Sequence, residues 1–286
     1  MNKPLADLVD LLGLETLEDT LFRGRSEDLG WGAVYGGQVL GQALSAAEQT
    51  VPEDRSVHSL HAYFLRKGDP SRPVIYDVDC IRDGRSFTTR RVVAIQHGRP
   101  ILNAAASFQV SEEGFTHQDP VPASKGPEGV ASETSLFRKY ADLIPEGPLK
   151  RRALADKPIE VRVVDPVNPL NPDIREPVRQ VWFRSNGALP DVPRLHRWLL
   201  TWVSDSHFLT TAMLPHGVTW VTPGMQTASL DHTMYFHRPF RMDDWLLYDV
   251  QSPTAMGARG LVTGRFFQDG VLVASTTQEG LMRKWS

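Results

Sequence analysis

The sequence has a single cysteine, Cys80, among its 286 residues. One cysteine cannot form an internal disulfide or a thiolate cage for a metal, and it fits a reducing compartment. No stretch approaches the roughly 18 consecutive apolar residues of a membrane span, and Asp7, Asp10 and Glu15 interrupt the leucine-bearing N-terminus, which excludes a signal-peptide core. The final residues, 283–286, are not the S-K-L address of peroxisomes. We therefore expect a cytoplasmic protein that does not enter a membrane.

The chain also lacks an excess of charge of one sign. It has 31 Lys and Arg residues against 34 Asp and Glu residues, a formal net charge of −3. Proteins that bind nucleic acids or membrane surfaces usually carry a basic excess, so neither partner is expected here. Hydrophobic residues make up 41% of the chain, which is enough for the core of one large domain or of two ordinary ones.

Several catalytic signatures are missing. The chain has no G-x-S-x-G elbow and no P-loop, and Gly30-Trp31-Gly32 lacks the third glycine of a dinucleotide fingerprint. The nine histidines form no H-E-x-x-H motif. His58 and His61 are three apart in an expected strand, which predicts opposite faces. These absences argue against a serine nucleophile, a nucleotide, a metal or any other cofactor.

Hydrophobic spacing divides the chain into two similar halves. In the first, a short amphipathic helix near residues 5–12 and a strand at 20–24 precede a glycine-rich turn. Apolar and small residues at helical spacing predict a helix over 38–49, and His97-Gly98-Arg99 is expected to be a hairpin turn. Alternating patterns predict four further strands, at residues 58–66, 74–81, 88–96 and 101–110. One helix followed by an antiparallel meander indicates an α+β fold.

A connector rich in proline and glycine follows, from about residue 113 to 155, with one short helix expected near 136–143. The second half then repeats the plan of the first, with a helical segment at 195–214 and a turn at Gln268-Asp269-Gly270. Its expected strands are residues 159–164, 178–184, 231–238, 245–251, 259–268 and 271–282.

A shift of 172 residues relates the two halves. It places Tyr63-Phe64 on Tyr235-Phe236 and Gln96 on Gln268. The matches are few, but each falls at an equivalent point in the same order of elements. A duplicated domain is therefore the best explanation.

The first half contains GRSEDLGWGAVYGGQVLGQAL, VHSLHAYFLRKGD, DGRSFTTRRVVAIQHGRPI and AAASFQV, and the second contains SDSHFL, SLDHTMYFHRPFRMDDWLLY, ARGLVTGRFFQDGVLVAST and QEGLMR. In these motifs the chain resembles the acyl-CoA thioesterase II (TesB-type) family over nearly its whole length. The resemblance implies a double hotdog fold, in which each half wraps an antiparallel sheet around a helix. The expected units are residues 1–115, a linker at 116–155, and a C-terminal hotdog at 156–286 that carries the catalytic residues.

The resemblance also implies hydrolysis of medium- to long-chain acyl-CoA to a free fatty acid and CoA, as in fatty acid metabolism. In the family a water molecule is held by an Asp, a Thr or Ser, and a Gln. Carried over by motif, these are Asp205 in S-D-S-H-F-L, Ser229 in Q-T-A-S-L-D-H and Gln278 in T-T-Q-E-G. Asp205 would act as general base, while Ser229 and Gln278 would orient the water and the developing oxyanion. Many relatives have Thr where this chain has Ser229, but the hydroxyl is retained.

The repeat adds an expectation about the first half. The shift of 172 pairs Asp205, Ser229 and Gln278 with Ala33, Val57 and Ala106, none of which can move a proton. We therefore expect the first hotdog to be a non-catalytic copy that forms the scaffold and a wall of the pocket.

CoA is an anion, so basic residues should face it. The candidates for substrate binding are His58, Arg85, Arg91 and Arg259, the arginines being drawn from clusters that also contain Arg82, Arg90 and Arg265. A core histidine and solvated arginines at strand edges are the alternatives for these positions. Aromatic residues that could line an acyl tunnel, or could be plain core, are Trp31, Tyr35 and Phe64.

A non-catalytic acyl-CoA-binding protein is the alternative function, and it would need no general base at Asp205. Members of the family are commonly dimers or larger, so the resemblance also implies a homo-oligomer.

Overall fold

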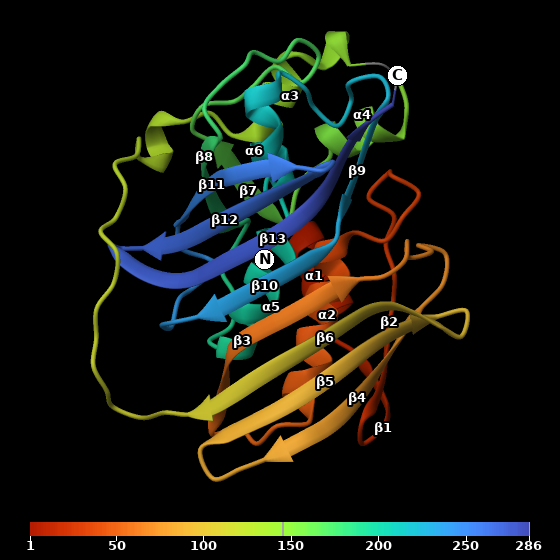
Figure 1. The fold of residues 1–286 in the computed structure, drawn as a ribbon, viewed down its shortest axis with the longest axis vertical. Coiled ribbons are helices and arrows are strands. Elements are labelled where there is room, and N and C mark those ends of the chain that lie inside the picture. Colours follow the sequence, from red (N-terminus) through yellow and green to blue (C-terminus); the bar gives the residue numbers. More distant parts are fainter. Residues whose placement is uncertain (145, 286) are drawn as a thin grey trace.

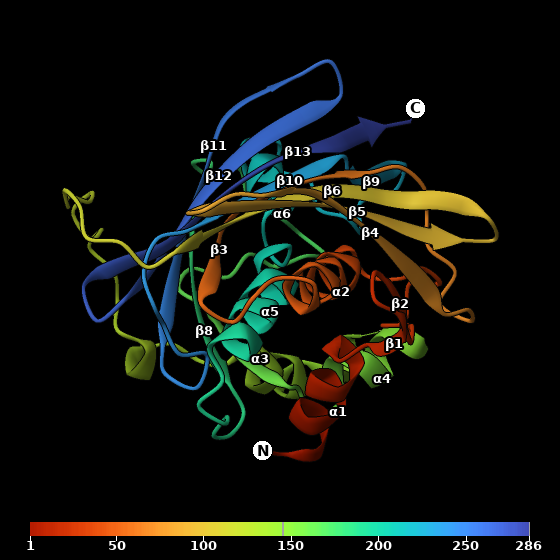
Figure 2. The same cartoon turned by 90° about the horizontal axis from the view of Figure 1, so that it is seen from below.

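One antiparallel sheet of 13 strands runs through the molecule and curves around its helices (Figure 1). The computed structural model describes residues 1–144 and 146–285. Figure 2 shows the sheet nearly edge-on, with the helices α2 (Gly36–Gln49) and α5 (Pro193–Ser204) beneath it and α1 (Lys3–Leu12) below them. The site described below lies between this sheet and its helices.

The first half forms the elements that its hydrophobic pattern predicts, within a few residues. The leucines of α1 are buried, and Val74, Tyr76 and Val78 alternate with more exposed residues. His97 and Gly98 have φ values of 50° and 66°, which confirms the expected hairpin turn. One strand, β1, was not predicted because all four of its residues are exposed. The strands are β1 (Glu15–Glu18), β2 (Leu21–Gly24), β3 (Arg55–Phe64), β4 (Val74–Asp83), β5 (Phe87–Gln96) and β6 (Arg99–Val110).

The second half contains one more strand than the sequence predicts, β9, and its long helical segment is divided. Residues 195–214 were expected to be helical throughout, but α5 ends at Ser204 and the helix resumes as α6 (Leu209–Met213) and η3 (Leu214–His216). The interruption at residues 205–208 includes His207, whose φ is 60°. The strands are β7 (Ile159–Val163), β8 (Val178–Ser185), β9 (Met225–Ser229), β10 (Asp231–Phe236), β11 (Leu246–Met256), β12 (Arg259–Gln268) and β13 (Val271–Lys284).

The connector between β6 and β7 contains more helix than expected. The single helix predicted near residues 136–143 is a shorter α3 (Glu133–Lys139) followed by η2 (Ala141–Leu143). Two further short helices are η1 (Pro127–Gly129) and α4 (Pro148–Leu154). Pro145, one of the prolines that define the connector, lies outside the described residues. The division into three units at residues 115 and 155 stays a prediction.

Helix α2 lies in the concave face of the first half of the sheet. Its small side chains, including the fully buried Ala43, Ala46 and Ala47, let it approach both the strands and α5. The contact between α2 and α5 also contains a buried ion pair. Glu48 accepts hydrogen bonds from Arg197 Nε at 2.8 Å and from Trp198 Nε1 at 2.6 Å. The two halves are therefore joined through their helices as well as through the sheet.

Strand pairing confirms the repeat at the predicted shift of 172 residues. In the first half Ile75 pairs with Ile95 and His61 with Ala105. At the shifted positions, Leu247 pairs with Phe267 and Thr233 with Thr277. The same shift places the start of α2 at the start of α6, so α5 is an additional helix of the second half. The sheets meet where β3 pairs with β10, and each half wraps around a helix, which is the expected double hotdog fold.

One expectation about strand faces is wrong. His58 and His61 were predicted to point to opposite faces of the sheet, but both point to its outer face. The pairing of β3 with β6 shifts between Val57 and Ser59, so His58 is the extra residue of a β-bulge. His58 Nε2 lies 2.8 Å from Ser107 Oγ on that face, and His61 packs against Tyr235.

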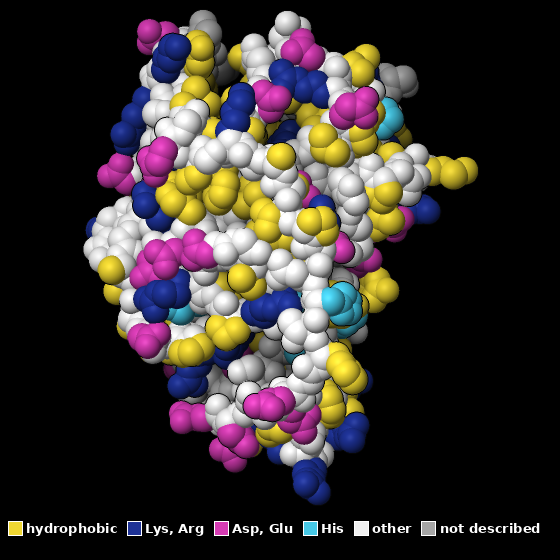
Figure 3. Space-filling model, turned by 90° about the vertical axis from the view of Figure 1, so that its left-hand side faces the viewer, with side chains coloured by type: hydrophobic (Ala, Val, Ile, Leu, Met, Phe, Trp, Pro, Cys, Tyr) yellow, Lys and Arg dark blue, Asp and Glu magenta, His cyan; other side chains and the backbone are white. Residues whose placement is uncertain are grey.

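The surface carries charges of both signs. On the face shown in Figure 3, basic and acidic side chains are interspersed, with small groups of hydrophobic side chains between them. Among the described residues, no helix has the length and apolar character needed to cross a membrane.

Candidate active site

Asp205 lies at the interruption between α5 and α6. It is the C-cap residue of α5, and the peptide N–H groups of Asp205 and Ser206 both donate to the carbonyl of Val203. The hydroxyl of Ser206 lies 2.8 Å from the phenol oxygen of Tyr35, which comes from the first half of the chain. Asp205 therefore lies in a short turn that is fixed by backbone bonds to α5 and by a side-chain bond to the first half.

Ser229 and Gln278 come to Asp205 from two different strands. Ser229 is the last residue of β9, a strand that the sequence did not predict, and Gln278 lies on the inner face of β13 with no exposed surface. Ser229 Oγ donates to Asp205 Oδ1 at 3.1 Å, and Gln278 Nε2 donates to the same oxygen at 2.7 Å. The structure thus brings together the three residues that the sequence singled out.

The orientation of the Gln278 carboxamide follows from this contact. A carboxylate can only accept hydrogen bonds, so the amide must turn its NH₂ group toward Asp205. Its Oε1 atom is then left buried, with no hydrogen-bond partner in the described part of the chain. An unpartnered buried acceptor is rare in a folded protein, and it marks a place where a polar ligand can donate a hydrogen bond.

The first half supplies a further part of the site that the sequence did not predict. A Cβ atom placed on Gly36, the first residue of α2, would lie 2.6 Å from Asp205 Oδ2 and 3.1 Å from the ring of Phe64. The first turn of α2 contains no acidic residue, and its N-cap, Tyr35, makes no side-chain capping bond. The free peptide N–H groups at a helix start favour a negative charge. The Asp205 carboxylate therefore lies next to the amino end of α2. The Gly36-Gly37 pair was the available signal in the sequence.

Buried polar groups hold the end of α5 in place. Ser204 Oγ lies 2.9 Å from His232 Nε2, and the phenol of Tyr248 donates to the Ser204 carbonyl at 3.1 Å. Burial lowers the pKa of His232 to about 4, against the raising effect of the Asp205 charge. Burial and the same charge raise the pKa of Tyr35 well above its usual value. Both side chains are therefore neutral near pH 7.

The other expected binding residues do not gather at Asp205. His58 lies on the outer face of the sheet, and the Arg85 carbonyl accepts a bond from Arg55. Arg91 pairs with Asp79 at 2.9 Å, and Arg259 with Glu279 at 2.8 Å. Their role in substrate binding stays a prediction.

Of the other residues in the same basic clusters, Arg90 is buried and bonded to Asp83 and Thr50, and Arg265 pairs with Asp119 and Asp249. Of the three aromatic candidates, Phe64 and the buried Tyr35 lie beside the site, and Trp31 is mostly exposed.

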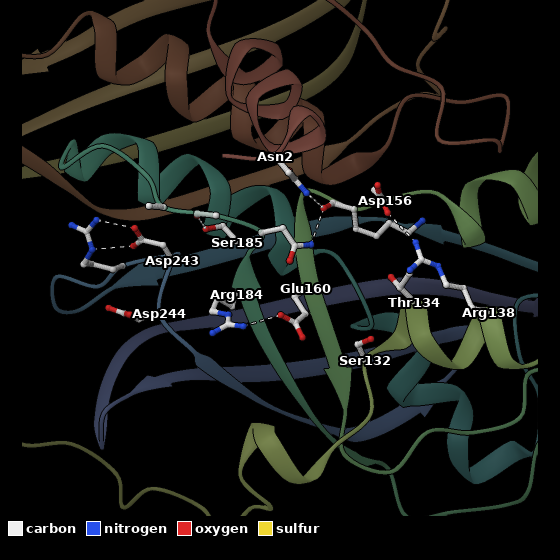
Figure 4. A pocket seen from close by; sticks show the side chains of 15 residues that line it. Asn2, Ser132, Thr134, Arg138, Asp156, Glu160, Arg184, Ser185, Asp243 and Asp244 are labelled. Carbon is white, nitrogen blue, oxygen red and sulfur yellow. Dashed lines mark hydrogen bonds and ion pairs between the residues drawn. The ribbon is translucent and has the colours of Figure 1, made fainter.

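A cavity of about 890 Å³ lies between the connector and the second half, and Asn2 near the N-terminus also lines it (Figure 4). Its charged side chains point mainly at one another. Arg138 pairs with Asp156 and Arg184 with Glu160. It contains none of the three site residues. Within the described residues, no group of three His, Cys, Asp or Glu side chains could hold a metal ion.

Comparison with known proteins agrees with this architecture. A family profile described as "Acyl-CoA thioesterase" matches residues 149–281, and one described as "Acyl-CoA thioesterase N-terminal domain" matches residues 25–109. "Acyl-CoA thioesterase 2" of Haemophilus influenzae is 45% identical over 99% of both chains. Human "Acyl-coenzyme A thioesterase 8" is 43% identical over 96% of this chain and 88% of its own. The acyl-CoA thioesterase II TesB2 structure from Mycobacterium marinum superimposes with a TM-score of 0.78 at 38% identity, and the match covers 98% of each chain.

The fold and the relatives define a class, the double hotdog thioesterases. The chain belongs to the acyl-CoA thioesterase II (TesB-type) family within it.

Proposed function

We propose that Asp205, Ser229 and Gln278 activate the water molecule with which this protein hydrolyses acyl-CoA thioesters. The protein is an enzyme of the acyl-CoA thioesterase family, as its relatives at 43–45% identity indicate. The observation that carries the assignment of the site is the convergence of the Ser229 hydroxyl and the Gln278 amide on one oxygen of Asp205. Because both bonds use Asp205 Oδ1, the other carboxylate oxygen, Oδ2, and the carboxamide oxygen of Gln278, Oε1, remain as acceptors for a single water molecule.

In the reaction, the water donates one hydrogen bond to Asp205 Oδ2 and the other to Gln278 Oε1. Its oxygen attacks the thioester carbonyl carbon while Asp205 takes its proton, which gives a tetrahedral oxyanion. Collapse of this intermediate breaks the C–S bond, and the CoA thiolate recovers the proton from Asp205. The products are a carboxylic acid and a free thiol. No covalent enzyme intermediate is needed, because a thioester carbonyl is already a good electrophile and the water is held in position.

The first half contributes through α2. The start of α2 lies beside Asp205 Oδ2, since a Cβ atom on Gly36 would come within 2.6 Å of that oxygen. We assign to the peptide N–H groups at this helix start the stabilisation of the negative charge that develops on the carbonyl oxygen during the attack. Donors placed in advance for a developing charge need not reorganise during the reaction. The non-catalytic role expected for Ala33, Val57 and Ala106 agrees with this division. Val57 pairs with Phe108 as Ser229 pairs with Gly280, and Arg90 pairs with Ala106 as Val262 pairs with Gln278.

Release of free thiol from a medium-chain acyl-CoA, followed with a chromogenic thiol reagent, tests the proposed site. Asp205→Asn should lower kcat by about 10²- to 10⁴-fold, the usual range for loss of a general base. Asp244→Asn makes the same chemical change on the surface of the second half and should leave kcat unchanged. Equal rates for wild type and Asp205→Ala would remove Asp205 from the mechanism.

Ser229 offers a second test. Ser229→Ala removes the hydroxyl and should reduce kcat by roughly 10- to 100-fold. Ser229→Thr keeps the hydroxyl and should retain most of the activity. A threonine variant as impaired as the alanine variant would show that side-chain volume, and not the hydroxyl, matters at this position.

Three finer features belong to the proposal. Medium- to long-chain acyl groups are the expected substrates, the cytoplasm is the expected compartment, and a homo-oligomer, a dimer or larger, is the expected assembly. Rates measured across a series of acyl chain lengths and the mass of the protein in solution would test the first and the last.

A further inference from the structure

A second cavity, of about 340 Å³, lies at the turn between β5 and β6. We call it the basic groove, and it is lined by Arg66, Lys67, Gln96, His97, Arg99 and Ile101. The side chains of Lys67 and Arg99 are exposed and form no ion pair within the described residues. The carboxylate at its margin, Asp69, is 3.1 Å from His97 Nε2 and accepts two bonds from Ser71. The groove therefore has an excess of positive charge.

The wall of the groove is firmly held. Gln96 is buried, and its Oε1 accepts from the Asp69 peptide N–H at 2.7 Å. Its Nε2 donates to the carbonyls of Asp69 and Arg72, each at 2.9 Å. Arg66 crosses to the other side of the groove and donates to the Pro100 carbonyl at 2.7 Å. These bonds fix the backbone that carries Lys67 and Arg99.

The basic groove adjoins the proposed active site. Strand β3 ends where β10 begins, and the Phe64 N–H donates to the Leu230 carbonyl at 2.9 Å, next to Ser229. The ring of Phe64 also contacts the start of α2 beside Asp205. Lys67 follows Phe64 by three residues, roughly 10 Å of extended chain. The pantetheine arm of CoA is longer than this, so a thioester at Asp205 would bring the phosphates of the same molecule within reach of the groove.

Comparison of the two halves shows which residues of the basic groove hold its backbone in place and which only add charge. In the second half, Gln268 Oε1 accepts from the Arg241 peptide N–H at 2.8 Å, and its Nε2 donates to the Arg241 carbonyl at 2.7 Å. Gln96 makes the same two bonds to the backbone of Asp69. Arg238 donates to the Leu272 carbonyl at 2.8 Å, just as Arg66 donates to the carbonyl of Pro100. The construction of the groove is therefore present twice, and Arg66 belongs to that construction.

The side chains that give the groove its positive charge have no counterpart in the second half. At the positions of Lys67, His97 and Arg99, the second half has Pro239, Asp269 and Val271. A side chain needed to hold the scaffold would be required in both copies. The copy with the cations adjoins Asp205, whereas the copy without them adjoins the positions where the first half has only alanine and valine. The positive charge is therefore found in the copy next to the proposed catalytic residues, and it is not needed to build the groove.

We propose that Lys67 and Arg99, with His97 beside them, bind the phosphate groups of the CoA part of the substrate. The proposal rests on the active site proposed at Asp205. Phosphate oxygens accept charge-assisted hydrogen bonds from ammonium and guanidinium groups, and these are stronger than bonds between neutral groups. Because the phosphates are remote from the thioester and do not change during hydrolysis, their binding affects substrate and transition state equally.

The test compares two substrates that carry the same acyl group, acyl-CoA and the acyl thioester of N-acetylcysteamine, which has no phosphate. Lys67→Ala and Arg99→Ala should each raise KM for acyl-CoA about 5-fold, and the double variant about 20-fold, with kcat within 2-fold. For the phosphate-free thioester, kcat/KM should not change. The increase in KM should shrink at ~0.5 M salt, because exposed charges are screened. Arg72→Ala removes an exposed cation of the same half that does not line the groove, and it should leave both substrates unaffected.

An unchanged KM for acyl-CoA in the double variant would overturn the proposal. So would an equal loss of kcat/KM with both substrates, since that result would mean that the groove acts through the scaffold. Inhibition by adenosine 3′,5′-bisphosphate gives a direct reading of phosphate binding and should weaken by a similar factor in the double variant. The Asp205→Asn variant keeps the two proposals apart. If it stays active while the phosphate-dependent effects hold, the mechanism fails and the groove assignment stands.

Discussion

Replacing Gly36 by alanine tests the geometry of the site with the addition of one methyl group. The new Cβ would lie 2.6 Å from Asp205 Oδ2, whereas ordinary contacts of a Cβ atom begin at 3.4 Å. The carboxylate must therefore move by about 0.8 Å, because the helix backbone on the other side is fixed by packing against α5. Misplacing a catalytic group by about 1 Å can cost 10²-fold in rate. We expect Gly36→Ala to lower kcat by roughly 30- to 100-fold.

The same substitution should affect stability much less. The preference of a helix interior for alanine over glycine is about 0.5–1 kcal/mol and is smaller at the first residue of a helix, so it offsets only a little of the strain of the new contact. Urea unfolding followed by circular dichroism should therefore shift by no more than about 2 kcal/mol while thiol release falls sharply. Gly114→Ala, whose Cβ would meet nothing within 4 Å, is the control and should change neither quantity. Wild-type kcat in Gly36→Ala would refute the placement of Asp205 against the amino end of α2.

Three further predictions concern stability. Gly37→Ala would place its Cβ 2.1 Å from the Trp202 carbonyl oxygen, a backbone atom, so it should destabilise the fold by about 2–4 kcal/mol in urea, more than Gly36→Ala does. Glu48→Gln leaves Arg197 without its buried partner and should cost about 3 kcal/mol, whereas Asp7→Ala, which breaks an exposed pair with Lys3, should cost under about 0.5 kcal/mol in the same assay. The folded-state pKa of His232 is about 4, below its value in the unfolded chain, so its neutral form stabilises the protein above pH 6.5 and this stability is lost as the pH falls toward 4. This histidine alone should make unfolding at pH 5 about 2 kcal/mol easier than at pH 7, and His232→Gln should reduce the change in unfolding free energy between these pH values by about that amount.

Local patterns in the sequence were sufficient for the repeat and for all the described strands except β1 and β9. The alternation in β4 and the hairpin turn at His97-Gly98 depend on neighbouring residues, so they can be read without knowing the fold. The strand registers of the two halves agree with the shift of 172 residues, because in both halves a one-residue slip would turn buried side chains to the surface. β1 could not be predicted, since its four residues are exposed and its pairing with β2 is decided elsewhere in the sheet.

The candidate site was predicted in part. Asp205, Ser229 and Gln278 were identified by their motifs, but their contact depends on β9 pairing with β13 and on the end of α5, which no local pattern describes. The interruption of the helix at Asp205 has the same origin. It is held by the bond between Tyr35 and Ser206, two residues that are far apart in the chain.

By itself, the sequence determined the order of most elements and the duplication, because these follow from periodicity. The three polar residues were identified by the resemblance of their motifs to those of the family. Only the tertiary structure decided which charges are available. Arg91 and Arg259 are neutralised by carboxylates on neighbouring strands, whereas Lys67 and Arg99 have no such partner in the described chain. It also decided that Gly36, in the first half, lies beside the Asp205 carboxylate of the second half. Both outcomes arise from contacts between segments distant in the chain, which depend on packing and not on local preference.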